Sequence, residues 1–98
     1  AYLLSMFRVQ NVMRGPDHPH AAPRKDIWDA IEAGVHVEGD ATLEEAMPLF
    51  EETSRLFLPV VRIGAKGEPP EVLGALFHVD ALRAYNRALA ATAAEEHS

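Results

Sequence analysis

The stretch between residues 35 and 87 constrains the fold of this chain more than any other part of it. A short apolar run leads into the segment DATLEE, which is typical of a helix start. A run of strand-forming residues, a loop rich in glycine and proline, a second strand and a final helix follow in that order. The sequence therefore predicts a unit of strand, helix, strand, strand and helix.

The first helix of this unit is predicted from a capping box. The Thr42 hydroxyl can accept a hydrogen bond from the backbone N–H of Glu45, and the Glu45 carboxylate can reach back to the backbone of Thr42. Pro48 lies beyond the first turn, where its missing N–H is expected to bend the helix without ending it. One apolar stripe at helical spacing is expected to face a core, and its members are Leu43, Ala46, Met47 and Phe50.

Two strands are predicted after this helix. Leu56 to Ile63 is almost continuously apolar, as expected of a strand buried on both faces. Glycines and prolines between residues 64 and 71 predict a surface loop, and Val72 to Val79 predicts the next strand. Gly74 within that strand indicates the close approach of another backbone or of a ligand.

The last helix is predicted to begin at Asp80, because aspartate is a favoured N-cap residue. Its apolar residues follow one side of the helix, and they are Leu82, Tyr85, Leu89 and Ala93. Together these elements predict one domain over residues 35–98.

Residues 1–34 are predicted to form a connector arm, a loop and a short helix ahead of that domain. Tyr2 to Met6 is expected to be a helical turn or an extended arm. The next residues, through Met13, are expected to be an extended connector that buries Val9, Val12 and Met13.

A loop and a short helix complete this N-terminal part. Three prolines and a glycine between residues 15 and 23 predict the loop. Pro23 to Gly34 predicts a short helix that ends at the glycine, and Val35 to Val37 predicts a short strand. Trp28 is expected to anchor this helix by packing or to cover the surface of a partner.

Charge and composition exclude several partners. The formal net charge is −6, from 15 acidic and 9 basic residues, and the basic residues are scattered singly. Nucleic acid is therefore not an expected partner, and neither is anionic lipid. There are no cysteines, which excludes disulfides and thiolate metal sites. The apolar opening is far shorter than the roughly 20 residues of a membrane span and lacks the pattern of a signal peptide.

Neither a metal site nor a catalytic site is predicted. Asp17, His18 and His20 lie close together, but no further ligand follows at a suitable spacing, so a solvated loop is expected. His36 and His78 are expected to be half-buried in strands. The sequence has no nucleophile elbow, phosphate loop or thiol, so the chain is not expected to be an enzyme.

The residues at the joints of this unit resemble a known family. GDATLEEAM, LPVV and LGALFHVDAL together resemble a CBS motif, a regulatory module that usually occurs in pairs. The upstream segment VQNVM resembles the connector that commonly precedes this motif. The ending DALRAYNRAL is similar to the C-terminal helix of CBS regions in bacterial ClC-type chloride channels and transporters.

This resemblance implies a fold, a setting and a partner. The implied fold is α+β, with a small, mostly parallel sheet and helices on one face. The implied function is that of a cytoplasmic regulatory domain of a membrane chloride channel or transporter, on the cytoplasmic side of the inner membrane. Its partners would be the transmembrane part of the host and another CBS motif, either a second copy of the chain in a homodimer or sequence outside it.

The resemblance also implies a ligand. The ligand of the family is usually an adenine nucleotide or adenosyl compound, such as ATP or AMP, held in the cleft between paired motifs. The residues of this chain at the implied positions are Val60, Val61, Leu76, Phe77 and Asp80. Phe77 stands where the family has serine or threonine, and Arg62 lies near a position that is often acidic. A core role for the aliphatic residues and a helix cap for Asp80 remain the alternatives, as does an adenine-nucleotide sensor in another host protein.

Overall fold

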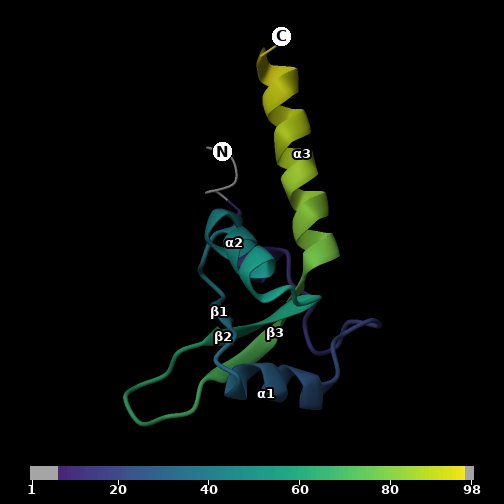
Figure 1. Cartoon of the computed structure of the whole chain (residues 1–98). Helices are drawn as coiled ribbons and strands as arrows, with labels where there is room; N and C mark the ends of the chain where they lie inside the picture. The colour runs from purple at the N-terminus through teal and green to yellow at the C-terminus, as the bar shows by residue number, and fades with distance from the viewer. Residues whose placement is uncertain (1–6, 97–98) are drawn as a thin grey trace.

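The structure is a computed structural model that describes residues 7–96, with side chains through residue 91. It is an α+β domain with a three-stranded sheet of strand order β1-β2-β3 (Figure 1). Strand β1 runs parallel to β2, and β2 runs antiparallel to β3. The elements are η2 (Val9–Asn11), α1 (Arg24–Glu32), β1 (Val37–Glu38), α2 (Leu43–Thr53), β2 (Phe57–Arg62), β3 (Glu71–Phe77) and α3 (His78–Glu96). The predicted α+β class and the order of strand, helix, strand, strand and helix are confirmed. The sheet is mixed and not mostly parallel, because the longer of its two pairings, between β2 and β3, is antiparallel.

The main core lies between the sheet and the pair of helices α2 and α3. Strand β2 is central, and its residues 58–61 are all buried, as its near-continuous apolarity predicted. Leu58 and Val60 of β2 and Leu76 of β3 belong to the same apolar cluster as Leu43 and Phe50 of α2. The ends of the predicted strand, Leu56 and Ile63, lie outside β2 and are exposed.

Helix α2 begins at the predicted capping box. The Glu45 N–H donates to the Thr42 hydroxyl at 3.3 Å, and the Thr42 N–H donates to the Glu45 carboxylate at 3.1 Å. The helix continues through Pro48, so the proline does not break it. It ends at Ser54, whose backbone takes the left-handed conformation with φ of 55°.

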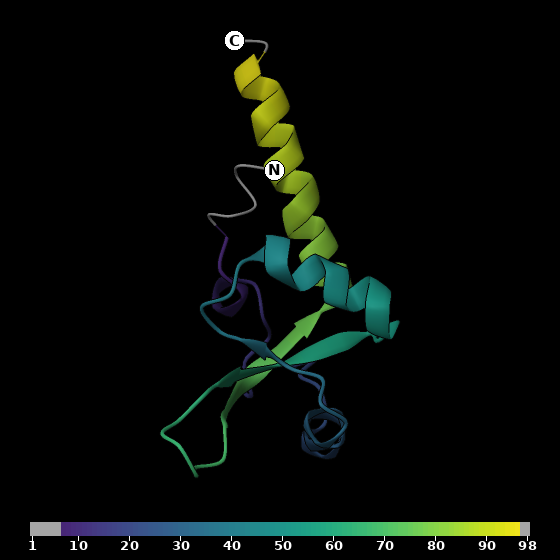
Figure 2. The ribbon, with the colours of Figure 1, turned by 60° about the vertical axis from the view of Figure 1, so that its left-hand side comes forward.

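Helix α1 covers the face of the sheet opposite to α2 and α3, as the two views of the ribbon show (Figures 1 and 2). The predicted stop at Gly34 is confirmed, since Gly34 has φ of +84°. Its N–H donates to the Ile31 carbonyl and the Val35 N–H donates to the Ala30 carbonyl, both at 2.9 Å. This pair of bonds is a Schellman motif. Ile27 and Ala30 are buried against the sheet.

The connector before this helix is not the extended segment that the sequence predicted. Val9–Asn11 forms a short 3-10 helix, because the N–H groups of Val12 and Met13 both turn back to the Val9 carbonyl. Burial of Val9 is as predicted, at 0% exposure, and Val12 and Met13 pack on the core. The predicted turn or arm at Tyr2 to Met6 lies outside the described residues.

Several predicted boundaries were wrong by a few residues. Strand β1 begins at Val37, so His36 is an exposed loop residue and not a half-buried strand residue. Strand β3 ends at Phe77, and α3 begins at once with His78. His78 is half-buried as predicted, but it is helical and stacks on Phe50 with ring centroids 4.5 Å apart.

The domain is elongated because α3 projects beyond the other elements (Figure 1). Its extents are 50 × 29 × 26 Å. Within residues 7–96, none of the helices combines the length and the apolar character that a membrane crossing requires.

Candidate functional site

Asp80 is the most specific residue implied by the family resemblance, and it is not a helix cap. Helix α3 starts two residues earlier, so Asp80 lies in its first turn. There the Asp80 carboxylate pairs with the Arg14 guanidinium, with Nε to Oδ2 at 2.7 Å and Nη2 to Oδ1 at 3.3 Å. This two-bond geometry is the strong form of an Arg–carboxylate pair. The side chains are 19% and 18% exposed.

Arg14 is placed by the backbone of β3. Its N–H donates to the Ala75 carbonyl at 2.8 Å, and the Ala75 N–H donates to the Arg14 carbonyl at 3.0 Å. Gly74 permits this approach, since a Cβ there would lie 2.3 Å from the Arg14 carbonyl oxygen. The predicted close approach at this glycine is therefore that of another backbone.

The Arg14 guanidinium also covers Phe77, the residue at the family's serine or threonine position. The guanidinium carbon lies 4.1 Å from the centre of the Phe77 ring, within the range of a cation–π contact. A further N–H of Arg14 donates to the His20 carbonyl at 3.0 Å. Arg14, in the connector, is thus bonded both to the loop that follows it and to the start of α3.

Beside this ion pair lies a polar cleft of about 610 Å³ between the connector and α3. Its charged side chains are those of Arg14, Asp80, Arg83 and Arg87, and His18 lies at its rim. Arg83 reaches Asp80 at 3.9 Å and remains largely exposed. The cleft therefore carries three guanidinium groups against one carboxylate, although the whole chain has a net charge of −6. Such a lining favours an anion.

The other residues implied for a nucleotide do not join Asp80 in this cleft. Val60, Val61 and Leu76 have 0% exposure, and Val60 and Leu76 point into the main core. Phe77 is half-buried beneath Arg14. The structure thus separates the five residues into three buried positions, one half-buried ring and one ion-paired carboxylate. Sequence reasoning missed Arg14, Arg83 and Arg87, because no local pattern links the connector to α3.

The histidines of the loop at residues 15–23 contact each other. The His18 Nδ1 accepts a hydrogen bond from the His20 backbone N–H at 2.9 Å, and the two rings are 6.1 Å apart. In the described part of the chain, no group of three or more histidine and acidic side chains is arranged to hold a metal ion.

A second surface lies on the outer side of α2 and α3. A groove of about 540 Å³ between these helices is lined by the side chains of Met47, Pro48, Leu82 and Tyr85, and also by Glu44, Glu51 and His78. Val79, Leu82 and Leu89 follow one another along α3 and are 46%, 41% and 46% exposed. This set of α3 residues, together with the groove, is called the helix face below. Of the α2 stripe that the sequence predicted to face a core, Met47 lines this groove, whereas Leu43, Ala46 and Phe50 are buried.

Comparison with known proteins does not assign either surface. No family model, curated protein or solved structure matches this chain, so its function is inferred from its own geometry.

Proposed function

We propose that this chain is a regulatory module of the CBS type that pairs with a second copy of itself through the helix face. The observation that carries the proposal is the apolar row on α3, where Val79, Leu82 and Leu89 remain between 41% and 46% exposed beside an apolar groove. The order of elements and the parallel pairing of β1 with β2 are compatible with the CBS resemblance of the sequence.

The helix face is favoured over the sheet as the contact surface. A sheet presented to a partner would need a free face, and here α1 covers the face that α2 and α3 leave open (Figure 2). Ile27 and Ala30 fill that position from within the same chain. Among the residues with described side chains, the outer side of α2 and α3 leaves an apolar row and an apolar groove for a partner.

The free energy expected from burying the helix face is in the range of a weak, regulatory pairing of two copies. Burying one aliphatic side chain is worth about 1.5–3 kcal/mol, whereas association costs about 4–15 kcal/mol in lost freedom. A two-fold pair uses each residue of the helix face twice. We therefore expect weak pairing of the isolated chain and stronger pairing when a host protein tethers two copies close together.

The proposed host is a membrane chloride channel or transporter, with this module on its cytoplasmic side. The support is the likeness of residues 80–89 to the final helix of CBS regions in bacterial ClC proteins. In this setting, two arrangements of the paired modules would favour different states of the membrane part. A ligand or an ionic change would act only through a difference in affinity between the two arrangements.

Pairing is tested by sedimentation equilibrium of the parent chain and two variants. Leu82→Asp places a charge in the helix face and is expected to raise the dimer dissociation constant at least about tenfold, because a buried carboxylate lacks a partner. Leu56→Asp is the matched control, since Leu56 is 81% exposed and lies away from the helix face. A parent chain that stays monomeric at all concentrations, or equal effects of the two variants, contradicts the proposal.

A second candidate function is the sensing of an adenine nucleotide, and the cationic lining of the cleft beside Asp80 favours it. ATP or AMP would bring phosphates to Arg83 and Arg87, and its ribose hydroxyls could donate to the remaining lone pairs of Asp80. The ligand would not reach Val60 or Leu76 without opening the core.

Calorimetry with ATP, AMP and an adenosyl compound tests this candidate. Arg87→Gln is expected to weaken ATP binding, whereas Arg62→Gln, outside the cleft, should not. Asp80→Asn separates two roles of the carboxylate: weaker adenosine binding indicates a ribose contact, and unchanged adenosine binding indicates that Asp80 only holds Arg14. No heat with any of the three compounds removes the candidate.

A further inference from the structure

A second cleft lies on the opposite side of the sheet from the helix face, and neither proposed function uses it. Its volume is about 510 Å³, which is within the size range of small-molecule sites. Strand β3 forms its floor at Gly74 and Ala75, and Pro16 and Ala21 form one wall. Helix α1 forms the other wall. The loop and helix that separate the connector from β1 therefore build this cleft.

The walls of the cleft are fixed by packing and backbone bonds. Helix α1 is held on the sheet by the buried residues Ile27 and Ala30 and ends in the Schellman motif. On the other side, the backbone of Arg14 is bonded to Ala75 by two hydrogen bonds. Sites on such elements are shaped before a ligand arrives, which reduces the entropy lost on binding.

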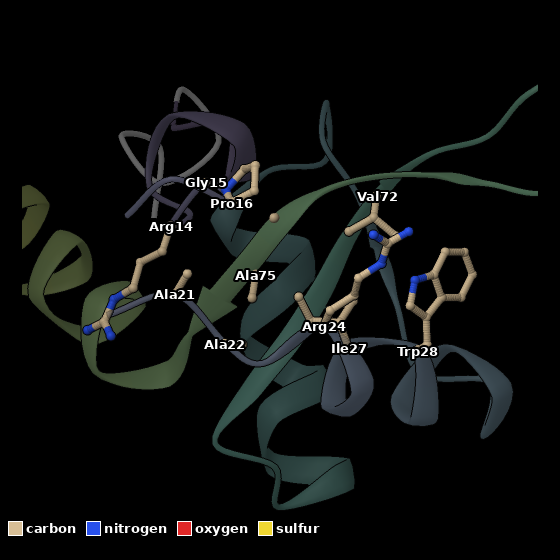
Figure 3. Close-up of a pocket in the computed structure, with 11 residues that line it drawn as sticks. Arg14, Gly15, Pro16, Ala21, Ala22, Arg24, Ile27, Trp28, Val72 and Ala75 are labelled. Atoms are coloured by element: carbon tan, nitrogen blue, oxygen red, sulfur yellow. The ribbon is translucent and has the colours of Figure 1, made fainter. Parts of the chain in front are cut away.

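The shape and chemistry of the lining fit a flat apolar group. Trp28 and Arg24 are four residues apart on α1, so they lie on one side of the helix. Figure 3 shows both side chains rising from α1, with the Arg24 guanidinium reaching toward Val72 and the Trp28 indole on the side of Arg24 away from Ala75. The Trp28 indole and the Pro16 ring are rigid apolar surfaces that suit an aromatic body.

The charge of the lining fits an anion. The charged residues of the lining are Arg14 and Arg24, and no carboxylate lines the cleft. Arg14 is already paired with Asp80, and its guanidinium points away from α1 (Figure 3). In the part of the chain with described side chains, Arg24 has no ion-pair partner within 4.0 Å. Its guanidinium is thus available to a carboxylate, which it can bind through two parallel hydrogen bonds.

We propose that this cleft binds a small aromatic carboxylate, with the ring against Ala75 and Trp28 and the carboxylate on Arg24. This site would be separate from the cleft beside Asp80 and from the helix face. It follows that binding here requires neither pairing of the chain nor affinity for a nucleotide.

The test uses 2-naphthoate as the probe and 2-naphthamide, with the same ring and no charge, as its control. Binding is followed by NMR on the isotope-labelled chain, because Trp28 is the single tryptophan and its indole N–H gives one resonance in the lining. Naphthoate is expected to shift that resonance and the amides of Gly74 and Ala75, and to bind at least about tenfold more tightly than naphthamide.

Two charge variants on α1 identify the contact. Arg24→Gln should abolish the preference for naphthoate while naphthamide binding persists. Lys25→Gln removes the same unit charge from the neighbouring position, which is outside the lining, and should leave the preference intact. Ala21→Leu should weaken both compounds by filling the cleft, and Leu82→Asp should change neither.

Three results would overturn the proposal. The first is the absence of any shift at Trp28 with naphthoate. The second is a set of shifts confined to α2 and α3, which would place the probe on the helix face. The third is an equal loss of the preference for naphthoate in Arg24→Gln and Lys25→Gln. That result would mean that Arg24 acts only through its positive charge and not through a contact with the carboxylate.

Discussion

The two faces of the sheet are covered by the same chain in different ways. On one face, α2 and α3 close a large core that contains Leu43, Phe50 and Leu76, all at most 2% exposed. On the other face lies the short helix α1 (Figure 2), which contributes Ile27 and Ala30 and leaves a cleft beside them (Figure 3). The first face, called the filled face below, is packed with buried side chains from α2 and α3. The second, called the roofed face, is covered by α1 with a cleft beside it.

This difference indicates where each kind of partner fits. The filled face is closed by buried side chains, and the helices that cover it show an apolar row on their outer side, which suits a second protein surface. The roofed face holds a cleft with an aromatic wall and an arginine. Pairing and the binding of an aromatic carboxylate are therefore assigned to opposite sides of one sheet.

The largest predicted effect tests whether the filled face contributes more to the free energy of unfolding than the roofed face. Phe50→Ala is expected to lower the free energy of unfolding by about 3–5 kcal/mol, since it removes a buried aromatic side chain from the core. Ile27→Ala on the roofed face, at 8% exposure in the parent chain, is expected to cost less, about 2 kcal/mol. Urea denaturation of both variants measures the difference. Equal losses would mean that both faces contribute alike, and the comparison would fail.

The next prediction concerns the backbone contact that joins the connector to β3. Gly74→Ala is expected to lower the free energy of unfolding by about 2–3 kcal/mol, because its Cβ would lie 2.3 Å from the Arg14 carbonyl oxygen and the backbone must shift. Gly15→Ala is the control, because a Cβ at Gly15 would meet no atom within 4 Å. Thermal denaturation compares the two. A Gly74→Ala variant as stable as Gly15→Ala would show that the connector is not fixed against the strand.

A third prediction concerns the ion pair at the start of α3. Arg14→Met is expected to cost about 1–3 kcal/mol, since it leaves the partly buried Asp80 carboxylate with only the largely exposed Arg83 at 3.9 Å. Adding Asp80→Asn should restore part of the loss, and a double-mutant cycle from urea denaturation gives the coupling energy. Additive losses in the double variant would show that the two side chains do not interact. The Arg14–Asp80 ion pair would then not contribute to holding the connector against α3.

The parts of the fold that follow from the sequence are those fixed by neighbouring residues. The capping box at Thr42, the stop at Gly34 and the buried run of β2 each depend on a few residues in a row, and all three are confirmed. The boundary between β3 and α3 was wrong because Asp80 is a good N-cap by type, yet its carboxylate is engaged by a distant guanidinium.

The parts that the sequence did not predict depend on contacts between distant residues. The Arg14–Asp80 pair joins residues 66 positions apart, and no periodic pattern connects them. The helix at α1 was predicted, but its position over the sheet was not, because Ile27 and Ala30 would suit any apolar surface. Both clefts were missed for the same reason, since each is bounded by segments from two or three separate parts of the chain.

The smallest predicted effect tests what holds α1 in place. The pKa of Lys25 is raised above its usual 10.5 by the hydrogen bond to Asp29 at 2.7 Å, and then by the attraction of the same carboxylate. Because the pKa in the folded state is the higher one, the contribution to stability is complete below the unfolded pKa and is lost as the pH rises through the folded pKa. Both side chains are exposed, and a lysine in the first turn opposes the helix dipole, so this contribution is expected to be slight.

Asp29→Asn should therefore return the Lys25 pKa toward its usual value, as followed by NMR of the lysine side chain, with little change in thermal stability at neutral pH. That combination is expected if the burial of Ile27 and Ala30 keeps α1 on the sheet. A large loss of stability in Asp29→Asn would instead make α1 dependent on its own surface charges. Helix α1, which forms one wall of the ligand cleft, would then pack less tightly on the sheet at high pH, and naphthoate binding would weaken in the same pH range.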